Sequence, residues 1–199
     1  MSVRPAIAFA KIAAPRKGSV VVLAAEDGQL AESAAIVDPE GVLKRAFAVA
    51  EFTGKLAASV EVLAPQGGSF DRLAVIGVGK PADLDEKAWN RIGGAALTAS
   101  KKAQEVSVLL DVAGATPSAD DAAALAFGIV LGAYSFDKYK TKKDNGKSAS
   151  SGPAKFTIQC ANPAAAKKAF AAAEAVANGV MLARDLVNEP ANVLGTLEF

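Results

Sequence analysis

The chain has 199 residues, of which 51% are hydrophobic and 22% charged, and its formal net charge is +1. This length fits one domain with a small appendage, and it allows burial of roughly 70% of the unfolded surface. A nearly neutral chain has no global field that attracts nucleic acid or anionic lipid, so such a partner would need a local patch.

Short apolar runs bounded by polar or turn residues predict strands along the whole chain. They lie at Val3–Ile12, Val20–Ala25, Val60–Ala64, Leu73–Val78, Val106–Val112 and Phe156–Cys160. Near-continuous apolar strands such as LAVIGV indicate a sheet that is buried on both faces. The first two strands could be adjacent, so we expect a mixed, mostly parallel sheet.

Polar residues at the predicted helix starts separate these strands. Asp38-Pro39 and Asn162-Pro163 each supply a side-chain acceptor and a proline for the first turn. Asp83 or Asp85 can cap a helix that runs to about Gln104. Strands that alternate with helices predict a three-layer α/β/α domain.

The longest apolar stretch, Ala122 to Tyr134, follows the acidic pair Asp120-Asp121, which suits a helix start. It is shorter than the roughly 18 residues that a membrane span needs, so we expect a buried core helix. Gly128 and Gly132 form a GxxxG pattern, which in a core helix favours close packing of another backbone.

The segment from Lys138 to Pro153 is polar and has no periodicity, so it is predicted to be a surface loop. From Pro163 to about Asn188 the pattern predicts one long helix, spanning roughly 39 Å. Such a helix is longer than a small sheet can cover, and we expect it to bridge two domains.

The residue inventory excludes several kinds of active site. The chain has no histidine and one cysteine, Cys160, which excludes a Ser-His-Asp triad, a His-assisted cysteine nucleophile and a Cys-rich metal site. Cys160 lies in an apolar run, so we expect a buried, unreactive thiol. Nothing indicates an oxidising compartment or a membrane, and we expect a cytoplasmic protein.

One glycine-rich turn deserves comparison with the dinucleotide fingerprint. GVGKPA, from Gly77 to Ala82, fits G-x-G-x-x-G/A after a strand. However, Pro81 removes an amide donor, and the next acidic residue, Asp111, lies too far along. We therefore favour an ordinary strand-to-helix turn. Gly54-Lys55 and Gly146-Lys147 lack the earlier glycine of a phosphate-binding loop.

A basic cluster beside Phe136 and Tyr139 is the candidate nucleic-acid contact. Its members are Lys138, Lys140, Lys142, Lys143 and Lys147. Asp137 and Asp144 offset part of this charge, and exposed lysine runs are usually only solvated. A solvated surface is the favoured interpretation.

Two strings of this sequence resemble the leucyl (cytosol) aminopeptidase family. They are LGAYSFDKYKTKK, Leu131 to Lys143, and ARDLVNEPANVLGTLEF, Ala183 to Phe199. Weaker support comes from FTGK, Phe52 to Lys55, and VIGVGK, Val75 to Lys80. The two stronger strings occur in the family's order and at roughly its spacing, so the resemblance spans essentially the whole chain.

The resemblance implies a smaller N-terminal α/β domain, akin to the macro domain fold, joined by a long helix to a catalytic domain. That catalytic domain would hold two divalent metal ions, zinc, manganese or magnesium, which activate a water to attack the N-terminal peptide bond of a substrate. The resemblance also implies assembly as a hexamer, and DNA binding by some bacterial members.

The family's metal-ligand string, Asn-Thr-Asp-Ala-Glu-Gly-Arg, and its Gly-Lys-Gly segment do not occur in this chain. No residue therefore matches a catalytic, metal or cofactor position. We expect residues 1–161 to form a non-catalytic domain, 162–189 an interdomain helix, and 190–199 the start of a catalytic domain.

On this interpretation the full-length protein is a metal-dependent leucyl aminopeptidase acting on peptides, and the 199-residue chain alone is inactive. Its domain would serve oligomer assembly and access to the active site. The alternative is a module that binds nucleic acid or an ADP-ribose-like nucleotide. A purely structural domain without a ligand is the third possibility.

Overall fold

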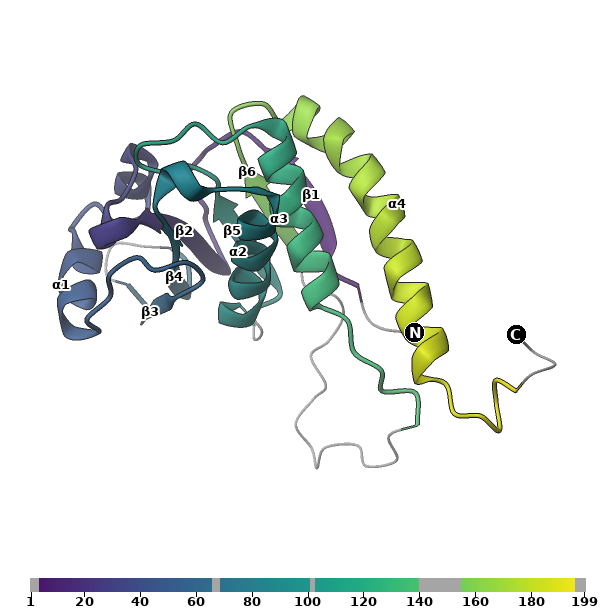
Figure 1. Ribbon diagram of the computed structural model, residues 1–199. Helices are drawn as coiled ribbons and strands as arrows, with labels where there is room; N and C mark the ends of the chain where they lie inside the picture. Colours follow the sequence, from purple (N-terminus) through teal and green to yellow (C-terminus); the bar gives the residue numbers. More distant parts are fainter. Residues whose placement is uncertain (1–3, 66–68, 101–102, 140–154, 196–199) are drawn as a thin grey trace.

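The computed structural model describes residues 4–65, 69–100, 103–139 and 155–195. Within these residues, a six-stranded sheet has the order β1-β6-β5-β2-β4-β3 (Figure 1). The strands are β1 (Ala6–Ala10), β2 (Ser19–Ala25), β3 (Ser59–Leu63), β4 (Arg72–Gly79), β5 (Glu105–Leu109) and β6 (Lys155–Gln159). The helices are α1 (Val42–Val49), α2 (Glu86–Ala99), α3 (Ala119–Gly132) and α4 (Pro163–Asn188). Short 3₁₀ helices are η1 (Glu26–Gly28), η2 (Glu32–Ile36) and η3 (Pro81–Asp83).

The sheet is mixed and mostly parallel, as predicted, but the predicted reason was wrong. In the described sheet, β1 pairs with β6 at one edge, whereas β2 lies between β5 and β4, so the first two strands are not adjacent. The antiparallel pair is β3 with β4, which a short connection joins. Apolar patterning identifies strands but does not specify their partners, and that is why the expectation failed.

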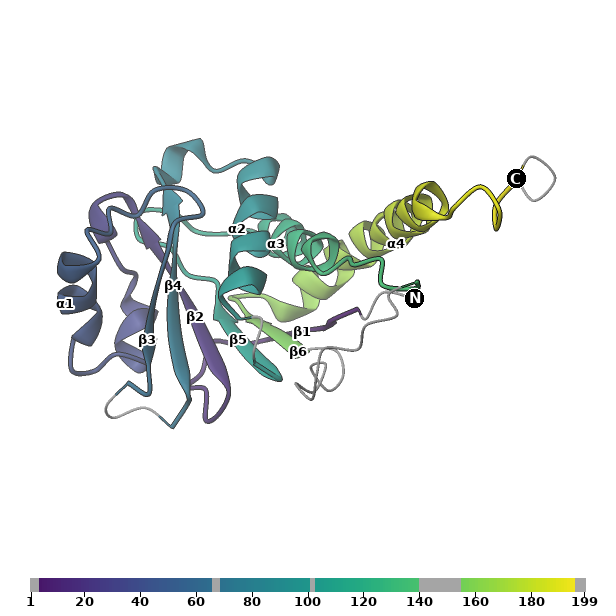
Figure 2. The same ribbon diagram turned by 90° about the horizontal axis from the view of Figure 1, so that it is seen from below.

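The three-layer α/β/α architecture is confirmed, and β2 shows its cause. Every residue of β2 is buried, and its side chains alternate between two cores. Val21 and Leu23 pack with α2, α3 and α4 on one face of the sheet. Val20 and Val22 pack with Leu43 of α1 on the other face. Figure 2 shows the sheet between these two helical layers.

Helix starts largely follow the polar signals of the sequence. The Asp85 carboxylate caps α2 by accepting from the Ala88 amide at 2.7 Å. α2 ends at Ala99, earlier than the predicted Gln104, because the chain must turn before β5 begins. Asn162 caps α4 and Pro163 opens it, as predicted.

The start of α1 differs from the prediction. Its N-cap residue is Gly41, whose φ of +69° suits glycine, so Pro39 lies before the helix and not in its first turn. Asp38 still serves the helix, because its carboxylate accepts from the amides of Val42 and Leu43 at 2.8 and 2.9 Å. The sequence therefore identified the capping side chain but placed the helix start too early.

Helix α3 is the buried helix that the apolar stretch predicted. Ser118 caps it and forms a reciprocal capping box with Asp121. A Cβ added at Gly128 would lie 2.1 Å from the Asn90 carbonyl oxygen of α2, so this glycine permits close backbone packing. None of the described helices combines the length and the apolar character that a membrane span requires.

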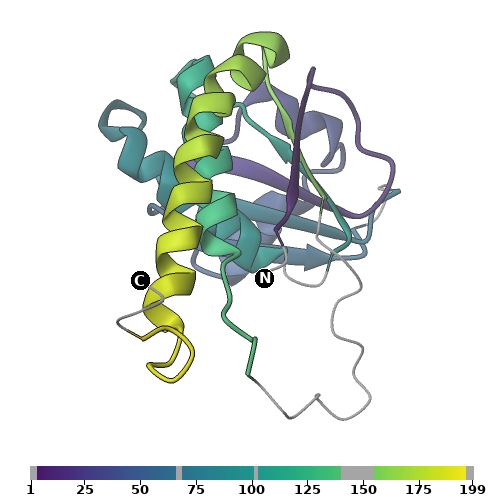
Figure 3. The same cartoon turned by 90° about the vertical axis from the view of Figure 1, so that its right-hand side faces the viewer.

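Helix α4 changes its environment along its length. Phe170 and Ala177 are buried in the core, and the Phe170 ring lies 5.8 Å from that of Phe9 in β1. Further along, Leu182 is 60% exposed and Val187 is 85% exposed. Figures 1 and 3 show this end of α4 projecting beyond the sheet. The long helix is present as predicted, and its role between two domains stays a prediction.

Candidate functional site

The predicted basic cluster is described only in part. Lys138 is within the described residues, whereas Lys140, Lys142, Lys143 and Lys147 lie outside them. The Lys138 ammonium donates to the Glu189 carboxylate at 2.5 Å. The one described lysine of the cluster therefore has an internal partner, and nucleic-acid binding by the cluster stays a prediction.

Glu189, directly after α4, accepts two hydrogen bonds from the segment that follows α3. Lys138 donates to one carboxylate oxygen, and the hydroxyl of Tyr139 donates to the other. We call these three residues the Glu189 clasp. The Glu189 side chain is 13% exposed, and these hydrogen bonds, that from Lys138 first, lower its pKa. The same contacts with Glu189 raise the pKa of Lys138 and of Tyr139.

A second set of contacts lies one turn earlier on α4. The Arg184 guanidinium sits 4.2 Å from the centroid of the Tyr134 ring and donates to the Leu131 carbonyl at 3.1 Å. Asn188 donates to the Tyr134 hydroxyl at 3.2 Å. Partial desolvation raises the pKa of Tyr134. Figure 3 shows the chain leaving α3 beside this end of α4.

These contacts join the two strings that carry the family resemblance. Residues 131–139 belong to the first string and residues 184–189 to the second, and the structure holds them together. Sequence reasoning singled out both strings but missed that they touch. The available signal was weak, consisting of an aromatic-rich segment and a helix end with complementary charges.

The two weaker strings also meet. The Gly79 amide donates to the Gly54 carbonyl at 2.8 Å, and a Cβ at Gly77 would lie 2.2 Å from the Lys55 carbonyl oxygen. Gly54 itself packs against the Ala25 carbonyl, so these glycines serve chain crossing at the ends of β2 and β4. The contacts support a structural turn at GVGKPA.

A pocket of about 430 Å³ borders this turn. It is lined by Glu26, Asp27, Thr53, Lys55, Leu56, Gly79, Lys80 and Asp83. Both charge signs are present, so the lining has no clear preference for the phosphates of a nucleotide. Binding of an ADP-ribose-like nucleotide stays a prediction.

Within the described part of the chain, no three His, Cys, Asp or Glu side chains converge in a way that could hold a metal ion. Cys160 is buried, and burial raises the pKa of its thiol, which keeps it protonated and poorly nucleophilic.

The comparisons with known proteins agree with this architecture. The N-terminal domain of the cytosol aminopeptidase family matches residues 21–143. The "probable cytosol aminopeptidase" of Chelativorans sp. (strain BNC1) is 60% identical over 200 residues, covering 100% of this chain and 40% of that protein. That of Rhizobium leguminosarum bv. trifolii (strain WSM2304) is 44% identical, again over 100% of this chain and 40% of that protein.

Solved structures show the same fold at lower identity. A tomato leucine aminopeptidase mutant superposes with a TM-score of 0.77 at 23% identity, covering 99% of this chain and 41% of that one. The bottromycin maturation enzyme BotP in complex with Mn gives a TM-score of 0.67 at 22% identity, covering 91% of this chain and 34% of that one.

The fold defines the class of the protein as a three-layer α/β/α domain followed by a long helix, whose far end is held by the Glu189 clasp. The chain belongs to the cytosol aminopeptidase family and contains the N-terminal domain of that family. It spans about 40% of the length of the curated relatives that it matches.

Proposed function

We propose that this chain is the N-terminal, non-catalytic part of a metal-dependent leucyl aminopeptidase that removes N-terminal amino acids from peptides in the cytoplasm. The names of the relatives support this activity, and the chain spans about 40% of their length. We assign the two divalent metal ions, manganese, zinc or magnesium, to the sequence that follows this region in the longer relatives. No reaction step is assigned to a side chain of this domain.

The observation that carries the proposal is the contrast along α4. Residues 163–177 are anchored in the core by Phe170 and Ala177, while the far end of the helix presents apolar side chains to solvent. Leu182 and Leu186, one turn apart on the same side of the helix, are 60% and 37% exposed; Val187 is 85% exposed, and Val193, just beyond the helix, is 42% exposed. Exposed apolar groups close together usually mark an interaction surface, and their burial is favourable by about 25 cal/mol per Å². A following catalytic domain is the partner that we propose for them.

The Glu189 clasp gives this end of the helix a defined direction. Glu189 is held by Lys138 and Tyr139, and the next residue is Pro190, whose ring restricts the backbone. The chain therefore leaves the domain from a fixed point. A fixed exit would let this domain set the position of the catalytic domain, and through it assembly into a hexamer and access of peptides to the active site.

A comparison of two chain lengths tests the activity. The 199-residue chain and a chain extended to the full length of the relatives are assayed with a leucyl-anilide substrate and added manganese. Only the extended chain is expected to turn over substrate. Robust metal-dependent turnover by the shorter chain would contradict the proposal.

Assembly and docking have separate measurements. Sedimentation of the extended chain is expected to give a hexamer. Amide exchange is expected to slow at residues 182–193 in the extended chain relative to the shorter one, because the exposed side chains become covered. Equal exchange in both chains would show that the catalytic part does not dock there.

A further inference from the structure

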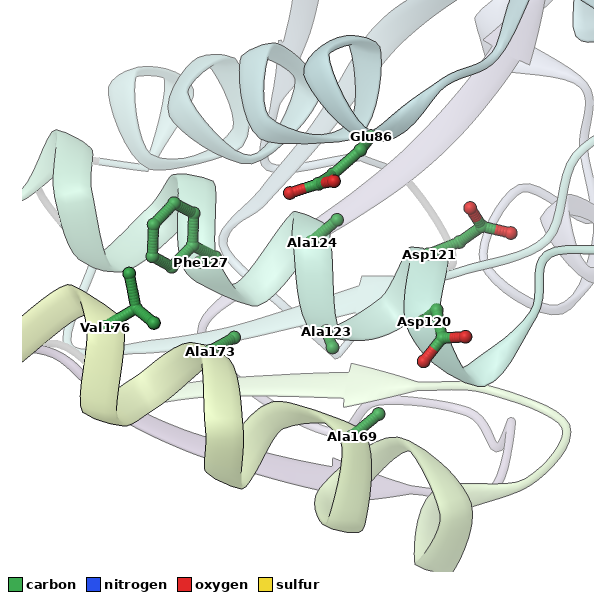
Figure 4. Close-up of a pocket in the computed structure, with 9 residues that line it drawn as sticks. All are labelled: Glu86, Asp120, Asp121, Ala123, Ala124, Phe127, Ala169, Ala173 and Val176. Atoms are coloured by element: carbon green, nitrogen blue, oxygen red, sulfur yellow. The ribbon is translucent and has the colours of Figure 1, made fainter.

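A groove runs along the outer side of α3, between α2 and α4 (Figure 4). Its volume is about 380 Å³, within the range of roughly 300 to 1,000 Å³ that is usual for ligand pockets. It is lined by Glu86, Asp120, Asp121, Ala123, Ala124, Phe127, Ala169, Ala173 and Val176. We call this feature the α3 groove. It is separate from the Glu189 clasp and from the pocket at the GVGKPA turn.

The floor of the α3 groove is apolar. Ala123 and Ala124 line it although the core leaves them only 5% and 8% exposed, and Phe127 is partly buried beside them. Ala173 and Val176 of α4 form one wall, and Val176 is 59% exposed. A helix that is apolar on all sides is normally covered on all sides. α3 packs on the sheet and between two helices, and its remaining apolar side faces this groove.

Acidic side chains flank the groove: Figure 4 shows Asp120 and Asp121 at the start of α3, and Glu86 reaching in from α2 above Ala124. Asp121 is used in the capping box with Ser118. Across the described residues, the side chains of Glu86 and Asp120 form neither a hydrogen bond nor an ion pair. Neither carboxylate is needed as a cap, because Asp85 caps α2 and Ser118 caps α3. The groove thus combines an apolar floor with two unmatched negative charges at its edges, Asp120 at the start of α3 and Glu86 on the α2 side.

We propose that the α3 groove binds a short peptide segment that carries a cationic group and an apolar side chain. The cation, a lysine, an arginine or a free N-terminal ammonium, would lie beside Asp120 over the start of α3, and Glu86 on the α2 side would add to the negative field there. The apolar side chain would lie against Phe127 and Val176. Asp120 and Phe127 are about 10 Å apart along α3 at 1.5 Å per residue, which corresponds to three or four residues of extended peptide.

The acidic edges and the apolar floor of the groove would contribute differently. Exposed carboxylates mainly steer and orient a charged partner, whereas burial on the alanine floor supplies affinity. Binding should therefore be weak, require both features of the peptide, and decrease as salt screens the charges.

The test uses the ¹⁵N-labelled 199-residue chain and a blocked four-residue peptide with lysine at one end and leucine at the other. Titration is expected to give saturable shifts at Ala123, Ala124, Phe127 and Ala173. Peptides with glutamate for lysine, or serine for leucine, should bind at least tenfold more weakly. Absence of saturable shifts at these residues would overturn the proposal.

Variants of the chain separate the two features. The double variant Glu86→Gln with Asp120→Asn should weaken binding about threefold to tenfold and remove most of its salt dependence, as expected for two exposed charge contacts. The matched control, Glu32→Gln with Glu40→Gln, changes the same net charge at exposed sites of the other helical layer and should leave binding unchanged. Equal weakening by both double variants would refute a local role for the carboxylates.

Ala173→Trp, which fills the groove, should abolish binding. The charge variants retain every apolar contact, so the test stands even if this bulky variant folds poorly. Sedimentation of the unliganded chain tests whether a second copy of the chain occupies the groove. If the chain self-associates, and Ala173→Trp makes it monomeric, the groove is an interface between copies and the peptide proposal is wrong.

Discussion

The two halves of α4, which we take as residues 163–177 and 178–188, belong to one alanine-rich helix, yet different kinds of contact hold them. The first half is fixed by burial, with Phe170 and Ala177 in the hydrophobic core. The second half is held at its tip by polar and aromatic contacts from residues 131–139, while Leu182 and Val187 remain exposed. The difference indicates that burial of the first half stabilises the domain, whereas the second half presents exposed apolar side chains to solvent.

The largest expected effect tests the buried half. Phe170→Ala should lower the free energy of unfolding by about 3–5 kcal/mol, because it removes a buried ring and leaves a cavity. Urea unfolding provides the measurement. Leu182→Ala is the matched control, since this exposed site of the same helix should change stability by about 0.5 kcal/mol or less. Similar losses at both sites would remove the distinction between the two halves.

The next effect concerns the packing of α3 against α2, because α3 lies between α2 and α4 on the same face of the sheet. Gly128→Ala should destabilise the domain by about 1–3 kcal/mol, because its Cβ would meet the Asn90 carbonyl oxygen. Gly94→Ala has open space and should be neutral or stabilising by up to about 1 kcal/mol. Thermal unfolding of both variants would reveal the contrast, and a neutral Gly128→Ala would mean that α2 and α3 can separate at little cost.

A smaller, local effect is expected at the helix tip. Arg184→Ala removes the contact with Tyr134 and the hydrogen bond to Leu131, so residues 182–188 should lose amide-exchange protection while the buried half keeps it. Global stability should fall by about 1 kcal/mol or less. Arg91→Ala, at an exposed arginine of α2, serves as the control. Loss of protection along the whole of α4 would show that the two halves unfold together.

The Glu189 clasp should respond to pH at both ends of the scale. The lowered pKa of Glu189 means that its contribution is present above the ordinary value of 4.5 and is lost as pH falls through the lowered value. The raised pKa values of Lys138 and Tyr139 mean that their contributions are complete below 10.5 and 10.0 and are lost as pH rises further.

Amide exchange near residue 189, corrected for its intrinsic pH dependence, should therefore be slowest between these limits. Glu189→Gln should remove the acid-side change while exchange at Phe170 stays the same. An acid-side change that survives in this variant would have to originate outside the clasp.

The smallest effect is expected from the lysine cluster. Lys138 is already matched by Glu189, so we expect no retardation of duplex DNA in the micromolar range. If retardation does occur, weakens steeply with salt and disappears when Lys140, Lys142 and Lys143 become Ala, the nucleic-acid alternative gains support. ADP-ribose can be titrated in the same way, and binding in the micromolar range would support the nucleotide alternative.

Local signals were sufficient for most elements of the fold. Apolar runs located the strands, and Asp85 and Asn162 marked helix starts that the structure confirms. The α1 start was placed too early. Asp38 accepts a hydrogen bond from the Val42 amide, but it lies before the N-cap residue, Gly41. Strand order was also missed, since the hydrophobic pattern of a strand shows that it is buried but not which strand pairs with it.

The sequence by itself determined the class of the domain, its family resemblance and the length of α4, because periodicity, capping and short strings are local properties of a chain. Only the tertiary structure decided that the two family strings contact each other, that Gly77 packs on Lys55, and that α3 leaves an apolar groove flanked by acidic residues. Those features depend on residues far apart in sequence, and their meeting is fixed by how helices and strands pack around a shared core.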